Sequence, residues 1–158
     1  MHSFEAENGD YASMSDFGLR DRWTEAKHTL LSASQLARIR PLNPSMTSEA
    51  WRFSLALRQP ESKDGRPADS LYANIESLNV EQGDVGTEWL QRRIGHEGSP
   101  IIVCWNAFWA VETDARLFAQ YWDSFCYPSS DDVAIFPLHC EWLVTYWHEE
   151  HLFFGRRR

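Results

Sequence analysis

The stretch IIVCW at 101–105 is a continuous apolar run, which is typical of a strand buried on both faces of a sheet. A second strand is predicted over 107–112, with Asn106 as the tight-turn residue between the two. Three more apolar segments, each bounded by turn residues, are predicted strands: 132–137, 141–148 and 151–155. Their short connections favour antiparallel pairing in a meander.

One helix is predicted over 113–125, between the second and third of these strands. Thr113 is its expected N-cap, and Leu117, Tyr121 and Phe125 follow at four-residue steps. The sequence therefore predicts an α+β fold, with N-terminal helices followed by a mostly antiparallel sheet and one crossing helix at about 113–125.

The N-terminal helices are less regular. A helical pattern runs from Trp23 to Ile39, where Ser32 and Ser34 would divide it into two short helices. Two more helices are expected, one capped by Thr47 or Ser48 and one over 86–95. The segment 71–78 fits either a helix or a strand.

The length of 158 residues and the 43% hydrophobic content predict one domain with a large core and exclude disorder of the whole chain. No apolar run approaches the roughly 20 residues that cross a bilayer. The first residues are acidic and polar, unlike a secretory leader. The net charge of −8 argues against a nucleic-acid partner. We therefore expect a cytoplasmic protein with neither a membrane nor a nucleic-acid partner.

Two segments stand apart in composition. Residues 1–21 form a predicted acidic N-terminal arm, either mobile or laid against the body by its aromatic residues, and residues 22–158 form the predicted single α+β domain. The final residues 156–158 are all arginine and are predicted to be a frayed tail. The three cysteines are odd in number and widely spaced, which predicts buried thiols and a reducing compartment.

Catalytic motifs are weak. The cluster His148-Glu149-Glu150-His151 spaces its histidines by three residues on a predicted strand, whereas a zinc protease spaces them by four on a helix. Together with His139 and Cys140 it leaves a small metal-dependent or Cys/His-based enzyme open as an alternative. No cofactor is predicted, since no phosphate-binding glycine loop with its lysine is present.

Aromatic and acidic residues indicate a protein-binding function more strongly than these motifs indicate an enzyme. Rings are concentrated between Trp105 and Phe154, more than a core of this size is expected to bury, and those left outside suit a protein interface. Residues 112–132 carry five acids against one arginine, which would attract a basic protein. The candidate partner-binding residues are Trp122, Asp123, Tyr127, Asp131, Asp132, Glu149 and Glu150.

The C-terminal pattern adds a resemblance. It is carried by WDSFCYPSSDD at 122–132, the strand end at 135–137, Trp142, Tyr146, the 148–150 cluster and Phe154-Gly155-Arg156. Over roughly 101–157 this resembles small bacterial immunity-type proteins encoded beside polymorphic or contact-dependent toxins. The resemblance implies a cytoplasmic protein that occludes one cognate toxin, for which a basic nuclease-type domain is one candidate. A structural subunit of a larger assembly is a third hypothesis.

Overall fold

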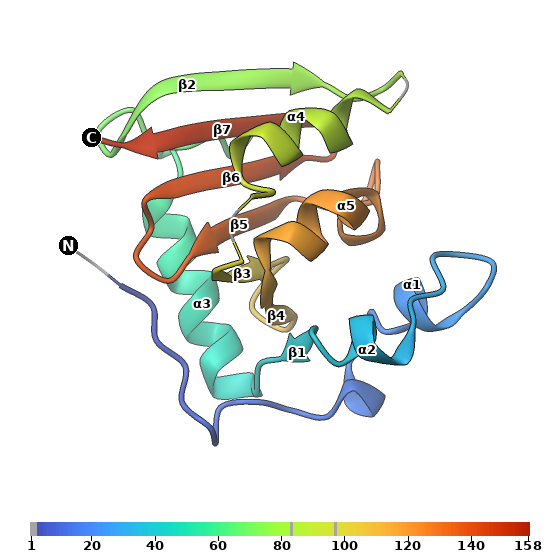
Figure 1. Cartoon of the computed structure of the whole chain (residues 1–158). Coiled ribbons are helices and arrows are strands. Elements are labelled where there is room, and N and C mark those ends of the chain that lie inside the picture. Colours follow the sequence, from blue (N-terminus) through green and yellow to red (C-terminus); the bar gives the residue numbers. More distant parts are fainter. Residues whose placement is uncertain (1–2, 83, 97) are drawn as a thin grey trace.

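The computed structural model describes residues 3–82, 84–96 and 98–158, and a seven-stranded sheet forms its centre (Figure 1). The strands are β1 (Arg40–Pro41), β2 (Tyr72–Asn79), β3 (Pro100–Cys104), β4 (Ala110–Asp114), β5 (Val133–Pro137), β6 (Trp142–Trp147) and β7 (His151–Arg157). Their order is β1-β4-β3-β5-β6-β7-β2, and every neighbouring pair is antiparallel. The α+β class and the meander of the last three strands are confirmed.

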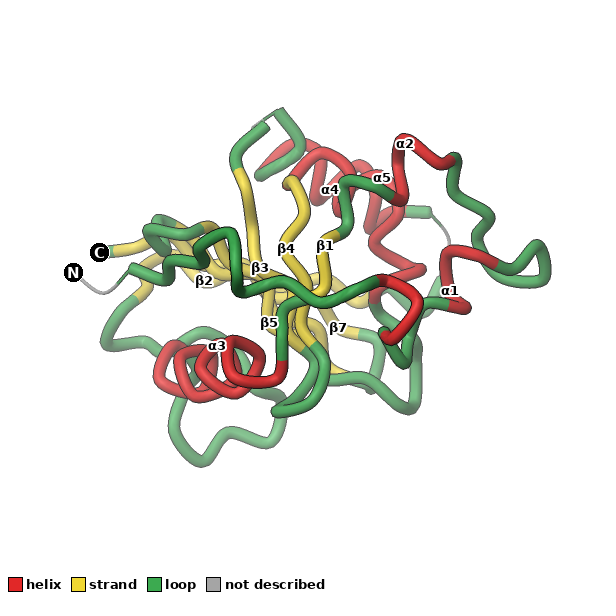
Figure 2. The backbone as a smooth tube through the Cα atoms, turned by 90° about the horizontal axis from the view of Figure 1, so that it is seen from below, coloured by secondary structure: helices red, strands yellow, loops and turns green. Residues whose placement is uncertain are grey.

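Helices cover both faces of this sheet. The helices are α1 (Asp21–Thr24), α2 (Ala33–Leu36), α3 (Pro44–Leu57), α4 (Val85–Arg93) and α5 (Ala115–Phe125), of which α3, α4 and α5 lie on the sheet. Figure 2 shows α3 on one side and α4 and α5 on the other. Helix α5 joins β4 to β5, and because these two strands flank β3, the connection passes over β3.

The residues of β3 explain the two-sided cover. Ile101 and Val103 belong to the core under α4 and α5, while Ile102 and Cys104 belong to the core under α3. All four are fully buried. A strand whose neighbouring side chains face opposite sides needs apolar partners on both, which confirms the buried strand predicted from 101–105.

The order of elements differs from the prediction of helices first and strands second. The two edge strands, β1 and β2, come from the N-terminal half and lie among the helices in sequence. The helical pattern from Trp23 gives only the short α1 and α2, and Ser32 accepts from Gln35 N–H in a capping box at the start of α2. Helix α3 begins earlier than predicted, at Pro44, because Asn43 caps it.

Two more boundaries shift. Strand β4 begins at Ala110 instead of residue 107, and Asp114, not Thr113, accepts from Leu117 N–H as the N-cap of α5. The predicted frayed tail at 156–158 is wrong, since β7 continues to Arg157 and Arg156 pairs with both Ala73 and Trp142.

Residues 3–21 lie against the body, which is the second of the two expected states. Phe4 is buried against Phe53 and Phe136, and Phe17 is buried against Trp23. Main-chain bonds fix the segment, since Phe4 N–H donates to the Leu138 carbonyl at 2.8 Å. Residues 1 and 2 of the predicted arm lie outside the described residues.

The three cysteine side chains lie in the core. Cys104, Cys126 and Cys140 are free and buried, as predicted.

Within the part of the chain that the structure describes, no helix is both long enough and apolar enough to cross a membrane.

Candidate functional site

One end of the sheet collects most of the predicted binding residues. Strands β3 and β6 end there and β5 and β7 begin there, so the antiparallel topology brings three connections together: 105–109, 126–132 and 148–150 (Figure 1). The predicted residues Tyr127, Asp132, Glu149 and Glu150 therefore come from two connections that share this end.

Asp132 and His148 join these two connections. The Asp132 carboxylate accepts from the main-chain N–H of His148 at 3.0 Å, and its Oδ1 lies 3.0 Å from the ring Nδ1 of His148. The main-chain N–H of Ser129 donates to the His148 carbonyl at 3.0 Å. The ring Nε2 of His148 lies 3.7 Å from a carboxylate oxygen of Glu149. The Asp132 carboxylate is thus held against the 148–150 connection, beside Glu149.

Asp131 is a different case from its neighbour, because it lies inside the fold with a relative exposure of 8%. Its carboxylate accepts from both terminal nitrogens of Arg22, the shorter bond being 2.6 Å, and from the main-chain N–H of Tyr127 at 2.8 Å. A carboxylate enclosed in this way ties α1 to the 126–132 connection, and a docking protein would not reach it.

Trp122 is also interior, at 8% exposure. Its indole packs over Gly86 in α4, and its Nε1–H donates to the Thr87 hydroxyl at 3.2 Å. Its ring also lies beside that of Tyr146. Trp122 therefore joins α5 to α4 and β6, and its prediction as a surface anchor is corrected: an amphipathic helix buries its apolar stripe against the sheet.

The remaining predicted residues are accessible. Asp123, Asp132 and Glu149 are exposed, and Tyr127 and Glu150 are half-buried. We call these five residues the acidic surface. The guanidinium carbon of Arg22 lies 3.9 Å from the centre of the Tyr127 ring. This contact fixes the orientation of the ring, and burial raises the pKa of the Tyr127 phenol.

The run of acids at 112–132 does not form one patch. Glu112 pairs with Arg40 and accepts from the Tyr11 hydroxyl, and Asp114 pairs with Arg38 at 2.6 Å. Both residues lie in β4, and β3 separates this strand from β5 in the sheet. Only Asp123 and Asp132 of this run contribute to the acidic surface.

Phe108 is an exposed aromatic residue that the strand prediction over 107–112 missed. It lies in the β3–β4 turn with 76% of its surface exposed. The Asn106 side chain accepts from the main-chain N–H groups of Phe108 and Trp109, at 2.8 and 3.0 Å, and so builds the turn. The tight-turn prediction at Asn106 was correct, but the turn is longer than one residue. An apolar groove of about 750 Å³ lies beside this ring, lined by Phe17, Leu42, Trp109 and neighbouring residues.

The structure does not bring the residues of the alternative metal site together. His139 and Cys140 precede β6, whereas His148 and Glu149 follow it, so the two halves lie at opposite ends of a six-residue strand. Such a strand is about 20 Å long, far beyond the span of one coordination shell. Among the described residues no group of three or more His, Cys, Asp or Glu side chains is placed to hold a metal ion.

The cysteines are also poorly placed as nucleophiles. Burial raises the pKa of the Cys104 and Cys140 thiols to about 12, and it raises that of Cys126 well above its ordinary value. Thiols with such pKa values stay protonated at neutral pH and act here as core residues.

Comparisons with known proteins supply no relative. No protein-family model, no curated protein and no solved structure matches this chain.

Proposed function

We propose that this chain is a cytoplasmic, immunity-type inhibitor that binds a cognate bacterial toxin and occludes its active site. The acidic surface would face a basic cleft of the toxin, as in a nuclease-type domain. The resemblance of the C-terminal half to immunity-type proteins motivates the class of partner, and the acidic surface supplies the place of contact.

The observation that carries the proposal is the link between Asp132 and His148. It joins the 126–132 and 148–150 connections and holds the Asp132 carboxylate through a main-chain and a side-chain bond, with Glu149 next to His148 on the second connection. Charges fixed before binding complement a basic partner without an ordering cost at the moment of association. The net charge of −8 extends the same field beyond the contact.

Phe108 adds an exposed aromatic side chain to the proposed contact with the toxin. Large aromatic side chains that reach into a partner pocket contribute a disproportionate share of binding energy. This ring is exposed at the same end of the sheet as the acidic surface. An aromatic anchor at the same end of the sheet as the acids would combine slow release with fast capture.

The proposal expects a gene beside that for this chain to encode the toxin domain, and the test uses that domain. Co-expression of the chain should restore growth of cells that produce this domain, and the purified pair should form a one-to-one complex. The double variant Asp123→Lys, Glu149→Lys should slow association roughly tenfold or more at low salt. Neither side chain is needed for the core, since both are exposed.

A matched control changes the same net charge elsewhere. The double variant Glu49→Lys, Glu61→Lys lies on and just after α3, on exposed positions away from the acidic surface. It should associate at close to the original rate. Equal slowing by both double variants would reduce the effect to net charge alone, and no protection by the original chain would refute the inhibitor function.

A further inference from the structure

Strand β2 presents an open main-chain edge along its second half. The N–H of Val80 donates to the Glu150 carbonyl at 2.8 Å, and the register pairs Leu78 with Leu152. In an antiparallel ladder alternate residues bond to the neighbouring strand and those between point away. Ser77 and Asn79 therefore turn their main-chain N–H and C=O groups outward, where no hydrogen-bond partner lies among the described residues.

Two other parts of the sheet boundary are protected. At the opposite edge, β1 has two residues, and the N–H of Ala12 donates to the Pro41 carbonyl at 2.8 Å. In the first half of β2, the N–H of Tyr72 donates to the Ala68 carbonyl at 3.0 Å. An irregularity in register between Ala73 and Glu76 then separates this half from the regular one. Natural sheets protect their edges in these ways, so the open stretch at 76–79 is an exception.

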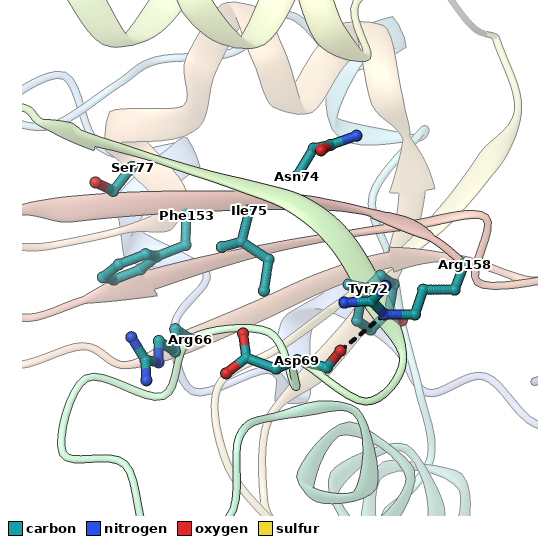
Figure 3. Close-up of a pocket in the computed structure, with 8 residues that line it drawn as sticks. All are labelled: Arg66, Asp69, Tyr72, Asn74, Ile75, Ser77, Phe153 and Arg158. Atoms are coloured by element: carbon teal, nitrogen blue, oxygen red, sulfur yellow. Dashed lines mark hydrogen bonds between the residues drawn. The ribbon is translucent and has the colours of Figure 1, made fainter.

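A cleft of about 330 Å³ lies directly beside this open stretch (Figure 3). Ile75 and Phe153 extend from the sheet toward the loop that carries Arg66 and Asp69. Ser77 pairs with Phe153 in register and lines the same cleft with a small side chain. A strand added to β2 would point every second side chain into this space.

The cleft is locally cationic. Arg66 and Arg158 line it together with one acid, Asp69. The side chain of Arg158 is held, since its Nε donates to the Asp69 carbonyl at 2.9 Å. Arg66 is exposed, and within the described part of the chain no carboxylate lies within ion-pairing distance of its guanidinium. Arg157, near the end of β7, lies with its guanidinium carbon 5.8 Å from the centre of the Tyr72 ring, which lines the same cleft.

We propose that β2 binds an extended segment of a partner protein by strand addition, with an acidic side chain of that segment in the cleft beside Arg66. Main-chain bonds to Ser77 and Asn79 would supply affinity, and the cleft would select the side chain. The cleft shares no residue with the acidic surface, although the open edge ends beside Glu150, and the proposal does not depend on the inhibitor function.

Peptide binding tests whether the cleft prefers an acidic side chain. The probe is a fluorescein-labelled heptapeptide, capped at both ends, in which valine and threonine alternate around a central glutamate. Fluorescence polarisation should show it binding roughly tenfold more tightly than the same peptide with a central lysine. Arg66→Glu should reverse this preference, while Arg52→Glu, at an exposed position on α3, should leave it unchanged. Equal binding of the two peptides to the original chain would refute the role of the cleft.

A proline substitution tests the strand addition itself. Ser77→Pro removes an outward N–H but no bond to β7, and edge strands accept proline at such positions. It should abolish peptide binding while the melting temperature stays close to the original, whereas Ser77→Ala should bind normally. Should Ser77→Pro unfold the chain, amide hydrogen exchange decides instead: peptide must slow exchange at Ser77 and Asn79 in the original chain.

The alternative occupant is a second copy of this chain. Sedimentation velocity should show a monomer over a wide concentration range. A dimer that Ser77→Pro dissociates would refute the proposal in favour of self-pairing, and unchanged amide exchange at Ser77 and Asn79 on addition of peptide would refute strand addition.

Discussion

Arg22 and Asp131 form a two-pronged ion pair that joins residues 109 positions apart in the sequence, with Nη1 of the arginine 2.6 Å from Oδ2 of the aspartate. The same Nη1 also donates to the Phe125 carbonyl at 3.1 Å. Both side chains are about nine-tenths buried. The pair attaches the N-terminal helices to the connection that carries the acidic surface, so it acts on that surface without contacting a partner.

Removal of this carboxylate should be costly. Asp131→Asn leaves the Arg22 guanidinium buried without its counter-charge, a change that typically costs about 3–5 kcal/mol. Urea unfolding measured by fluorescence should show this loss of unfolding free energy. The matched variant Asp132→Asn removes an exposed charge but keeps a side-chain oxygen to accept from His148, and should cost less than about 1 kcal/mol. Equal losses would contradict the structural role of Asp131.

Gly86 is required by the close approach of Trp122. A Cβ at this position would lie 2.5 Å from the Trp122 ring, well inside van der Waals contact. Overpacking of this kind costs about 1–3 kcal/mol, and the better helix propensity of alanine returns up to about 1 kcal/mol of it. Gly86→Ala should therefore lower the melting temperature. Gly9→Ala, where nothing lies within 4 Å, serves as the control and should change it little.

The thiols should be unreactive in the folded chain. Because burial raises the pKa of Cys104 and Cys140 to about 12, the reactive thiolate is scarce at pH 8 and the sulfurs are enclosed. A colorimetric disulfide reagent should detect almost no thiol in the native protein and all three in urea. Rapid labelling of one thiol without denaturant would mean that its part of the core opens readily.

Stability should fall in alkaline solution. The thiol of Cys104 has an ordinary pKa of 9.0 and a folded pKa of about 12, and burial raises the pKa of the Tyr72 phenol from 10.0 to about 12. Above pH 9 the unfolded chain therefore loses protons that the folded chain retains, and the free energy of unfolding decreases as pH rises toward 12. Urea midpoints between pH 8 and 11 measure this slope, and Cys104→Ala should reduce it. A flat profile would contradict the raised pKa values.

A substitution of Phe108 should change the binding affinity without changing the stability of the fold. Since the ring is 76% exposed, Phe108→Ser should leave the free energy of unfolding within about 0.5 kcal/mol of the original. The same variant should weaken binding of the cognate toxin at least roughly tenfold if the ring is an anchor. Calorimetry of binding, with thermal unfolding as the control, distinguishes the two effects. Unchanged affinity would remove Phe108 from the proposed interface.

Several elements could be predicted from local pattern alone. The apolar run at 101–105 required cover on both faces, and the cores under α3 and under α5 provide it. The segments 132–137, 141–148 and 151–155 became the meander β5-β6-β7, with ends shifted by only one or two residues. Such predictions succeed because alternation and turn residues are properties of neighbours in the sequence.

The α+β class, the C-terminal meander and the burial of the thiols could be predicted from the sequence, because each depends on local hydrophobic pattern. Contacts between distant residues set which acids are buried: Asp131 and Asp132 are adjacent, yet one is buried in a pair with Arg22 and the other is exposed beside His148. Tertiary structure also brought Ser77, Phe153 and Arg66 to one cleft and left one edge of the sheet open. Charge pairing and edge position depend on contacts between distant residues, which no local pattern contains.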